Sequence, residues 1–208
     1  MTAETSTRAR IREAAEQLFA EHGFRRVTVR DISRAARVNV AAVNYHFGDK
    51  MGLYQEVVQG AIEAMQGTTE AARRAGEGLA PEGRLRVFVA TFVSRLLAGG
   101  PRTVQRLVQR EMGDPTPALE RLVEEGVRPR LQFLAGLVAE ILGCRPSDPR
   151  VQRSVSSIQA QALAVVPNAV AARLGFSPTQ ADAGAIAEHI TAFSLGGLRG
   201  LASRARKR

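Results

Sequence analysis

The chain has 208 residues, enough for one large helical domain or for a small domain joined to a larger one. Its formal net charge of +9 favours a polyanionic partner, and nucleic acid is the commonest soluble one. The single cysteine, Cys144, excludes an intrachain disulfide framework and fits a reducing cytoplasm.

Two segments of the chain bear on whether it enters a membrane, and neither indicates a membrane protein. The N-terminal residues are charged from the start and lack the apolar run of a signal peptide. The segment Ser154–Ala172 carries no charge, but Pro167 and Asn168 would be costly in lipid. We therefore expect a soluble, cytoplasmic protein in which this segment is a helix buried between protein surfaces.

Apolar residues recur with helical periodicity almost everywhere, and no stretch alternates as a strand would. A first helix is predicted from a cap at Ser6 or Thr7 to about His22, with Gly23 supplying its left-handed C-terminal cap. Its inward face is expected to carry Ile11, Ala14, Ala15, Leu18 and Phe19. Thr28 with Asp31 three residues later resembles a capping box and starts a second helix.

Asn39 is a suitable cap for a third helix over Val40–Phe47, and Asp49 for a long fourth helix from Lys50 to about Arg74. The loop Gly76–Gly83 follows. Further helices are predicted over Arg84–Ala98, Pro101–Met112, Pro117–Leu142 with a break or kink at Pro129, Pro149–Leu174 and Pro178–Ser203. The expected fold is all-α: a three-helix domain, residues 1–50, joined by a long helix to a larger helical domain, residues 51–208.

The segment from Thr28 to Lys50 has the order of a helix-turn-helix: a cap, a short helix, a tight break and a second short helix. Val40, Val43 and Phe47 are spaced to face the first two helices. The outward residues are then Ala41, Ala42, Asn44, Tyr45 and His46. An ordinary helical hairpin with an aromatic contact would show the same spacing.

The outward residues suit DNA. Small side chains at Ala41 and Ala42 let the backbone approach closely, and Asn44 can pair with adenine. Tyr45, His46 and Lys50 can reach phosphates, and Thr28 lies at a helix N-terminus that attracts them. The candidate DNA-binding residues are Thr28, Arg30, Asn39, Val40, Ala41, Asn44, Tyr45, His46 and Lys50.

Residues 8–54 resemble the DNA-binding domain of the TetR/AcrR family of bacterial transcriptional regulators. The resemblance rests on Ala14-Ala15 with Leu18-Phe19, Gly23-Phe24, Thr28-Val29-Arg30-Asp31-Ile32, Tyr45-His46-Phe47 and Lys50. It implies phosphate contacts by Thr28, Tyr45 and Lys50, with Val40, Ala41, Asn44 and His46 nearest the base edges.

The chain departs from the family pattern at two positions. The family usually has Gly where Arg37 stands, at a helix end that favours a left-handed backbone, so either Arg37 costs on the order of 1 kcal/mol or the turn differs. The family also often has Tyr where Asn44 stands, so its operator preference does not carry over.

The C-terminal part resembles the CecR-like subgroup of that family. The residues concerned are Arg110-Glu111, Pro115-Thr116, Val127-Arg128-Pro129, the helix end at Gly143 and Ala160-Gln161. The resemblance implies a domain that binds an unidentified small-molecule effector and forms a homodimer through its last two long helices. The apolar residues Ile186, Ile190, Phe193 and Leu198, with Gly196 and Gly200, also favour dimerisation. The alternative is that both helices belong to the core of one subunit.

Several residues could line an effector pocket, although residues at such spacing more often form plain core. The candidates are Phe88, Phe92, Leu107, Arg110, Met112, Phe133 and Gln161. The sequence shows no catalytic motif, and His22, His46 and His189 are far apart, so we expect no enzyme activity, no metal and no cofactor.

We therefore predict a transcriptional regulator, a repressor released by its effector from a palindromic double-stranded DNA operator. Two alternatives remain: an architectural DNA-binding protein without an effector, and a helical enzyme or carrier whose N-terminus resembles a helix-turn-helix by coincidence.

Overall fold

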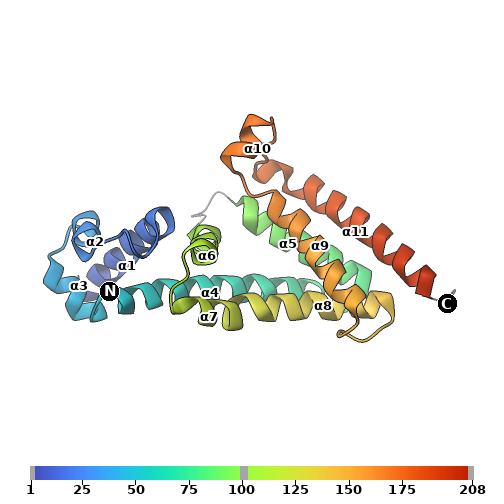
Figure 1. Cartoon of the computed structure of the whole chain (residues 1–208), viewed down its shortest axis with the longest axis horizontal. Coiled ribbons are helices and arrows are strands. Elements are labelled where there is room, and N and C mark those ends of the chain that lie inside the picture. Colours follow the sequence, from blue (N-terminus) through green and yellow to red (C-terminus); the bar gives the residue numbers. More distant parts are fainter. Residues whose placement is uncertain (1–2, 99–102, 206–208) are drawn as a thin grey trace. The chain divides into compact units, whose positions relative to one another are not determined.

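The computed structural model describes residues 3–98 and 103–205, and within these ranges it contains helices and no strand (Figure 1). The elements are α1 (Ala3–His22), α2 (Val29–Ala36), α3 (Val40–Phe47), α4 (Lys50–Ala75), α5 (Pro81–Leu97), α6 (Thr103–Gly113), α7 (Ala118–Arg121), the π-helix η1 (Leu122–Val127), α8 (Arg128–Leu142), α9 (Pro149–Ala164), α10 (Ala169–Arg173), the 3-10 helix η2 (Gln180–Asp182) and α11 (Ala183–Ala205). The predicted all-α fold is confirmed. Pro101, the predicted first residue of one helix, lies outside the described residues.

Residue contacts divide the chain into two compact units. The first contains Met1–Met65 and Pro101–Val127, and the second contains Gln66–Gly100 and Arg128–Arg208. The helix α4 contributes its first part to one unit and its last turns to the other. The predicted boundary at residue 50 separates a DNA-binding part from an effector-binding part, and it stays a prediction. The two compact units are defined by residue contacts and do not coincide with these parts.

The first unit is built around the inner face of α1. Ile11, Ala15 and Phe19, four residues apart, are fully buried, while Ala14 and Leu18 are half-buried beside them. Their neighbours in the same core come from α2, α3, α4 and from the later segment: Ile32, Val43, Leu53, Tyr54, Val57, Leu107 and Leu122. The face predicted for the first helix is therefore the one that packs.

The second unit packs α5, α8, α9 and α11 around a separate apolar core. Its larger members include Leu85, Phe88, Phe92, Leu134, Leu137, Ile158, Ile190 and Leu198. Surface ion pairs join its helices, among them Arg84 with Glu140 at 2.8 Å and Arg199 with Glu82 at 3.1 Å. Exposed pairs of this kind contribute about 0–1 kcal/mol each, so burial of the apolar side chains holds the unit together.

The chain is not interrupted at Pro129, where a break or kink was predicted, but the form of the helix changes just before it. The six residues Leu122–Val127 form a π-helical turn, and Pro129 follows it as the second residue of α8. Proline has no N–H and its ring clashes with the carbonyl four residues back, so a locally widened helix accommodates it.

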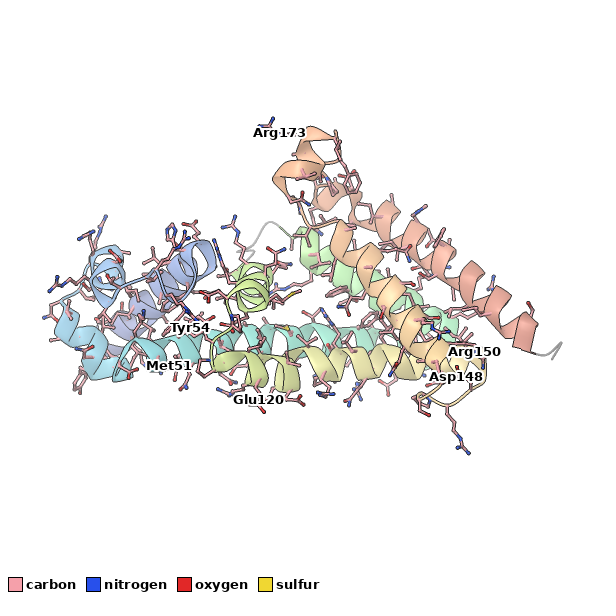
Figure 2. All side chains as sticks on the ribbon, in the orientation of Figure 1. Met51, Tyr54, Glu120, Asp148, Arg150 and Arg173 are labelled. Atoms are coloured by element: carbon pink, nitrogen blue, oxygen red, sulfur yellow. The ribbon has the colours of Figure 1, made fainter. Side chains whose placement is uncertain are left out.

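The predicted continuous helix Pro149–Leu174 is wrong. The helix α9 ends at Ala164, and a short helix, α10, begins at Ala169 after a break that contains Pro167. Asn168 caps α10, since its Oδ1 accepts hydrogen bonds from the N–H groups of Val170 (3.1 Å) and Ala171 (2.9 Å). At the other end of α9, Asp148 accepts from the backbone N–H of Arg150 and pairs with its guanidinium at 2.8 Å (Figure 2).

The uncharged segment Ser154–Ala172 is consequently divided between α9, α10 and the connection that joins them. Within the described part of the chain, no helix has both the length and the apolar character needed to cross a membrane.

Candidate nucleic-acid interface

The N-terminus of α2 is fixed by the capping box predicted for Thr28 and Asp31. The Thr28 Oγ1 accepts from the Asp31 N–H at 3.2 Å, and the Asp31 Oδ2 accepts from the Thr28 N–H at 3.0 Å and from its hydroxyl at 2.6 Å. These bonds from Thr28 lower the pKa of the Asp31 carboxyl below its ordinary value. The hydroxyl of Thr28 is thereby already used, so a phosphate at this end of α2 would be met chiefly by backbone N–H groups and the helix dipole.

The turn between α2 and α3 is left-handed at Arg37. Its φ and ψ are 56° and 50°, and among the described non-glycine residues it alone has a positive φ. The Arg37 N–H donates to the Arg34 carbonyl and the Val38 N–H donates to the Ser33 carbonyl, the pair of bonds that defines a Schellman motif. Arg37 thus adopts the left-handed conformation that favours glycine, so the turn does not differ from the family pattern here, and the energetic cost of the arginine stays a prediction.

The helix α3 has the predicted bounds and the predicted cap. The Asn39 Oδ1 accepts from the Ala42 N–H at 2.7 Å, and Gly48 ends the helix with φ 77°. Val43 is fully buried against α1 and α2, and Phe47 is half-buried. Asn39, a candidate DNA contact, is exposed, but its side-chain oxygen is committed to the cap.

The opposite side of α3 is open. Ala41 and Asn44 are exposed, Tyr45 is 77% exposed and Val40 is 39% exposed. The spacing predicts that Val40, like Val43, faces the first two helices. This is wrong for Val40, which is exposed, whereas Val43 is fully buried against them. The exposed position of Val40 agrees with the role that the family resemblance implies.

His46 lies between this open side and the core. It is half-buried, and its ring meets that of Tyr45 edge-on, with centroids 5.1 Å apart. Arg30, the candidate on α2, is exposed. The structure thus places Arg30, Val40, Ala41, Asn44 and Tyr45 at the surface of the α2–α3 segment.

Lys50, the last candidate DNA contact, is turned toward the protein. Its Nζ donates to the carbonyls of Phe24 and Val27, each at 3.1 Å, and lies 4.3 Å from the centroid of the Phe24 ring. An ammonium group has three donors, so one remains for a phosphate. The observed contacts of Lys50 therefore hold the α1–α2 connection against the start of α4.

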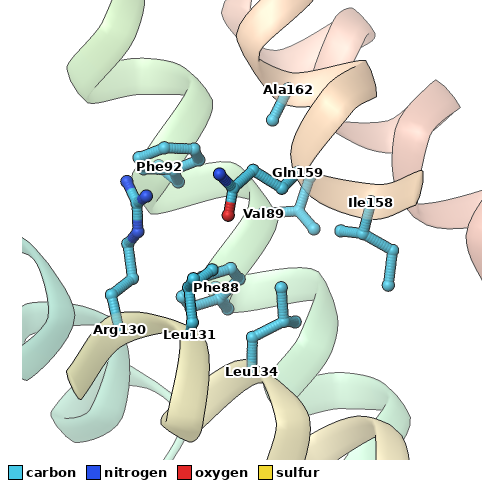
Figure 3. Close-up of a pocket in the computed structure, with 9 residues that line it drawn as sticks. All are labelled: Phe88, Val89, Phe92, Arg130, Leu131, Leu134, Ile158, Gln159 and Ala162. Atoms are coloured by element: carbon cyan, nitrogen blue, oxygen red, sulfur yellow. The ribbon is translucent and has the colours of Figure 1, made fainter. Parts of the chain in front are cut away.

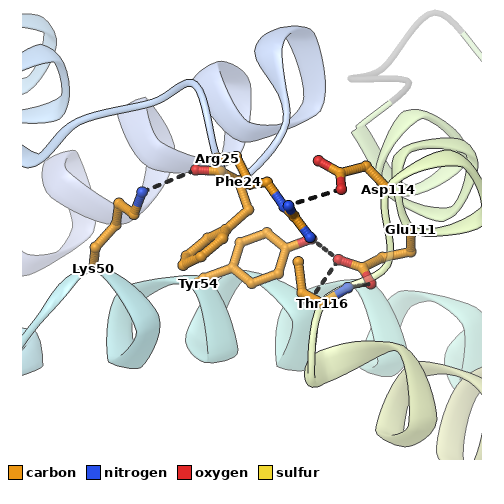
Figure 4. A network of polar contacts seen from close by, with 7 residues as sticks. All are labelled: Phe24, Arg25, Lys50, Tyr54, Glu111, Asp114 and Thr116. Atoms are coloured by element: carbon orange, nitrogen blue, oxygen red, sulfur yellow. Dashed lines mark hydrogen bonds and ion pairs between the residues drawn. The ribbon is translucent and has the colours of Figure 1, made fainter.

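The helix α6 belongs to the same compact unit as α1–α3. A buried polar network joins it to Tyr54 on α4 (Figure 4). Glu111 is 1% exposed; it accepts a short hydrogen bond from the Tyr54 hydroxyl, and bonds from the Thr116 N–H (2.9 Å) and hydroxyl (2.8 Å). Burial, and then the contact with Glu111, raises the pKa of Tyr54 well above its ordinary value. At the surface, Arg25 and Asp114 form an ion pair at 3.0 Å.

The candidate effector residues do not gather in one place. Phe88 and Phe92 line a small cavity of the second unit (Figure 3). The ring centroid of Phe133 lies 5.9 Å from that of Phe88. Gln161 lines a different groove, between α9 and α11.

The other three candidates belong to the first unit. Leu107 is part of its buried core, Arg110 donates to the carbonyl of Glu21 on α1, and Met112 is 78% exposed. None of these three lines the cavity at Phe88 and Phe92.

Two polar residues that line this cavity were missed in the sequence. Arg130 on α8 and Gln159 on α9 both reach it (Figure 3). A signal was available, because Arg130 stands four and seven residues before the buried Leu134 and Leu137, in register with the apolar stripe of α8. Within the described ranges, no group of three or more His, Cys, Asp or Glu side chains is placed to hold a metal ion.

The α1–α4 arrangement, with a capped α3 presenting an open polar side, defines a helix-turn-helix protein of the all-helical class. Residues 11–57 match the family described as bacterial regulatory proteins, tetR family. Residues 81–198 match the C-terminal domain of the HTH-type transcriptional dual regulator CecR. The chain therefore belongs to the tetR family of bacterial regulatory proteins, with a C-terminal domain of the CecR type.

Individual relatives agree with this assignment. The regulatory protein RaaS of Mycobacterium tuberculosis is 30% identical over 61% of this chain and 60% of its own length. The dual regulator CecR of Shigella flexneri is 26% identical over 66% of both chains. The probable regulator YttP of Bacillus subtilis is 40% identical over 32% of both chains. The chain thus spans between about a third and two thirds of the length of these relatives.

Solved structures share the fold. The fatty acid degradation regulator FadR from Bacillus halodurans is 23% identical, with a TM-score of 0.67 over 93% of this chain and 96% of that one. The ketosteroid regulator KstR2 of Mycobacterium tuberculosis is 20% identical, with a TM-score of 0.65 over 91% and 93%.

Proposed function

We propose that this protein is a transcriptional regulator that binds double-stranded DNA with α3 in the major groove. The observation that carries the proposal is the open side of α3, where Asn44 and the 77% exposed Tyr45 project from a helix fixed by Asn39 at one end and Gly48 at the other. A short helix held at both ends presents its side chains in a defined register, which base reading requires.

The roles of the residues follow from their placement. The Asn44 carboxamide can make a bidentate pair with adenine, and Ala41 allows the backbone close to the groove floor. Tyr45 and the N-terminus of α2 at Thr28 meet phosphates, which set the register of the protein on the duplex. Lys50 contributes mainly by holding the segment in place, with one donor available to the backbone of DNA.

The active form in this proposal is a homodimer. A groove of about 280 Å³ runs between α9 and α11, and its lining includes Gln161 and Phe193, whose side chain is 67% exposed. A second copy would cover this apolar groove and place two copies of α3 roughly 34–36 Å apart, one turn of B-DNA, on a palindromic operator.

We further propose that the protein is a cytoplasmic repressor released by a small-molecule effector. The aromatic cluster of Phe88, Phe92 and Phe133 is the supporting feature, since apolar cavities with a few polar groups are the usual sites of small ligands. Ligand binding then shifts the population toward a form with lower affinity for DNA, which needs only a few kcal/mol of differential affinity.

One observation favours the alternative, an architectural DNA-binding protein without an effector. The cavity at Phe88 has a volume of about 10 Å³, room for about one water molecule. An effector would have to displace side chains to enter, whereas an architectural protein needs no cavity. DNA binding that no small molecule changes would support this alternative.

Selection of bound sequences from random DNA tests the proposal. We expect a palindrome, and we expect Asn44→Ala to lose about 1–3 kcal/mol of discrimination at one position of each half-site. Gln132→Ala, which removes an exposed amide from α8, is the matched control and should bind like the wild type. Enrichment of no sequence, or equal weakening of all sequences by Asn44→Ala, would contradict the base-reading role.

A further inference from the structure

The cavity of the second unit is apolar on nearly all sides. Three helices line it: α5 with Phe88, Val89 and Phe92, α8 with Arg130, Leu131 and Leu134, and α9 with Ile158, Gln159 and Ala162 (Figure 3). The rings of Phe88 and Phe92 are stacked, with centroids 6.1 Å apart. Only Arg130 and Gln159 bring polar side chains to it.

Arg130 has no carboxylate partner in the described part of the chain. Its guanidinium carbon lies 4.4 Å from the centroid of the Phe92 ring. By contrast, other arginines of this unit do have carboxylate partners, as Arg84 has Glu140 and Arg150 has Asp148. Burial lowers the pKa of Arg130 to about 10, so the group is still a cation at neutral pH. Arg130 is half-buried, so its charge is partly removed from water and is faced by the Phe92 ring rather than by a carboxylate, an arrangement that an anion would stabilise.

Gln159 is the second polar group without a partner. No hydrogen bond joins its carboxamide to another described residue, whereas Gln161, two residues on, donates to the Ser157 carbonyl at 3.2 Å. Figure 3 shows the side chains of Arg130 and Gln159 directed toward the same space beside Phe92. The Arg130 guanidinium and the Gln159 carboxamide therefore come together in this cavity, and no hydrogen bond joins either of them to another described residue.

We propose that this cavity binds an organic anion, a carboxylate carried on an apolar chain or ring. The carboxylate accepts two parallel hydrogen bonds from the Arg130 guanidinium and one from the Gln159 amide. The apolar body lies among Phe88, Leu131 and Ile158. The inference rests on the proposed function only in taking this ligand as the effector; the binding chemistry stands on the cavity itself.

The volume of about 10 Å³ describes the closed form of this site. A ligand body needs some hundreds of Å³. Leu131 on the cavity wall is half-buried, so rotation of its side chain can open part of this space, and the helices that line the cavity would have to move apart for the rest. The cost of opening reduces affinity, and the new charge-assisted bonds to Arg130 offset it.

Isothermal titration calorimetry on the purified full chain tests the site. The probes are decanoate and 4-phenylbutanoate below any micelle-forming concentration, with decanol as the neutral match of decanoate and decyltrimethylammonium as its cationic match. We expect decanoate to bind at least about tenfold more tightly than decanol, about 1.4 kcal/mol, and the ammonium compound not to bind. Equal binding of decanoate and decanol would overturn the proposal.

Variants locate the anion. Arg130→Met should remove the preference for decanoate over decanol, and Gln159→Leu should reduce it about threefold, with folding checked by circular dichroism. Arg145→Met, which removes an exposed arginine between α8 and α9, is the control and should keep the full preference. Unchanged decanoate affinity in Arg130→Met would overturn the proposal even if the other variants failed to fold.

DNA binding, measured separately, distinguishes the two proposals. Binding of decanoate that depends on Arg130 but leaves operator affinity unchanged supports the anion site and contradicts its role as effector site. Release of DNA by uncharged compounds alone, without binding of decanoate, contradicts the anion site and leaves the regulator intact.

Discussion

The α2–α3 segment and the cavity of the second unit treat polar side chains in opposite ways. In the segment, Thr28, Asn39 and Lys50 all bond to backbone or side-chain groups of the same unit. In the cavity, Arg130 and Gln159 have no such partner among the described residues. The first arrangement fixes a surface in advance, whereas the second leaves two polar side chains available to the organic anion proposed above.

The difference has an energetic consequence. A polar group with an internal partner stabilises the fold, so its removal lowers the free energy of unfolding. A half-buried cation without a carboxylate partner, such as Arg130, lowers the stability of the fold, so its removal should raise the free energy of unfolding. Substitutions of the same kind in the two regions therefore test the comparison directly.

The largest effect is expected for Lys50→Met. The variant keeps the apolar stem but removes donors to the carbonyls of Phe24 and Val27, so we expect the free energy of unfolding to fall by about 2–3 kcal/mol. Urea unfolding followed by circular dichroism measures it. Arg26→Met removes an exposed cation nearby and should change stability by less than about 0.5 kcal/mol. Equal behaviour of the two variants would remove the structural role of Lys50.

Arg130→Met should have the opposite sign. Methionine fills much of the same space without a charge, and we expect the free energy of unfolding to rise by about 1–2 kcal/mol in the absence of ligand. The same urea titration checks this. A fall as large as that of Lys50→Met would show that Arg130 already has a stabilising partner and would break the comparison.

A smaller gain is expected at the turn. Arg37→Gly places a residue without a Cβ at φ 56°, and we expect stability to rise by about 1 kcal/mol. The matched change Arg34→Gly lies inside α2 and should lower stability by about 1 kcal/mol. Thermal unfolding of both variants gives the signs. A loss in Arg37→Gly would mean that the arginine side chain stabilises the turn beyond its backbone cost.

Local features were the ones that could be predicted from the sequence. The capping box of Thr28 with Asp31, the Asn39 cap and the bounds of α3 depend on residues within four positions of one another, and all are confirmed. The π-helical turn just before Pro129 is also a local effect, although the helix is not broken there. The predicted helix after Pro149 is too long because the chain already ends α9 at Ala164, three residues before Pro167, whose ring and missing N–H do not fit inside a helix.

Contacts between distant residues could not be predicted in this way. Tyr54 and Glu111 are 57 positions apart, and nothing near either residue indicates the other. The sequence predicts Arg110 and Gln161 as the polar groups of the pocket, but the cavity is lined by Arg130 and Gln159 instead. Helical spacing identifies an apolar face, whereas the choice of facing helix depends on how the whole unit packs.

The packing of α6 beside α1 determines which fragments of the protein can fold. A fragment ending at Met65 would keep α1–α3 whole but lose Leu107 and Glu111, exposing the core beneath them and leaving the buried Tyr54 hydroxyl without its carboxylate. The part of the chain that would read DNA is therefore shorter than the part that can fold. Residues 103–127 lie within the match to the CecR-type domain, yet they complete the core of the first unit.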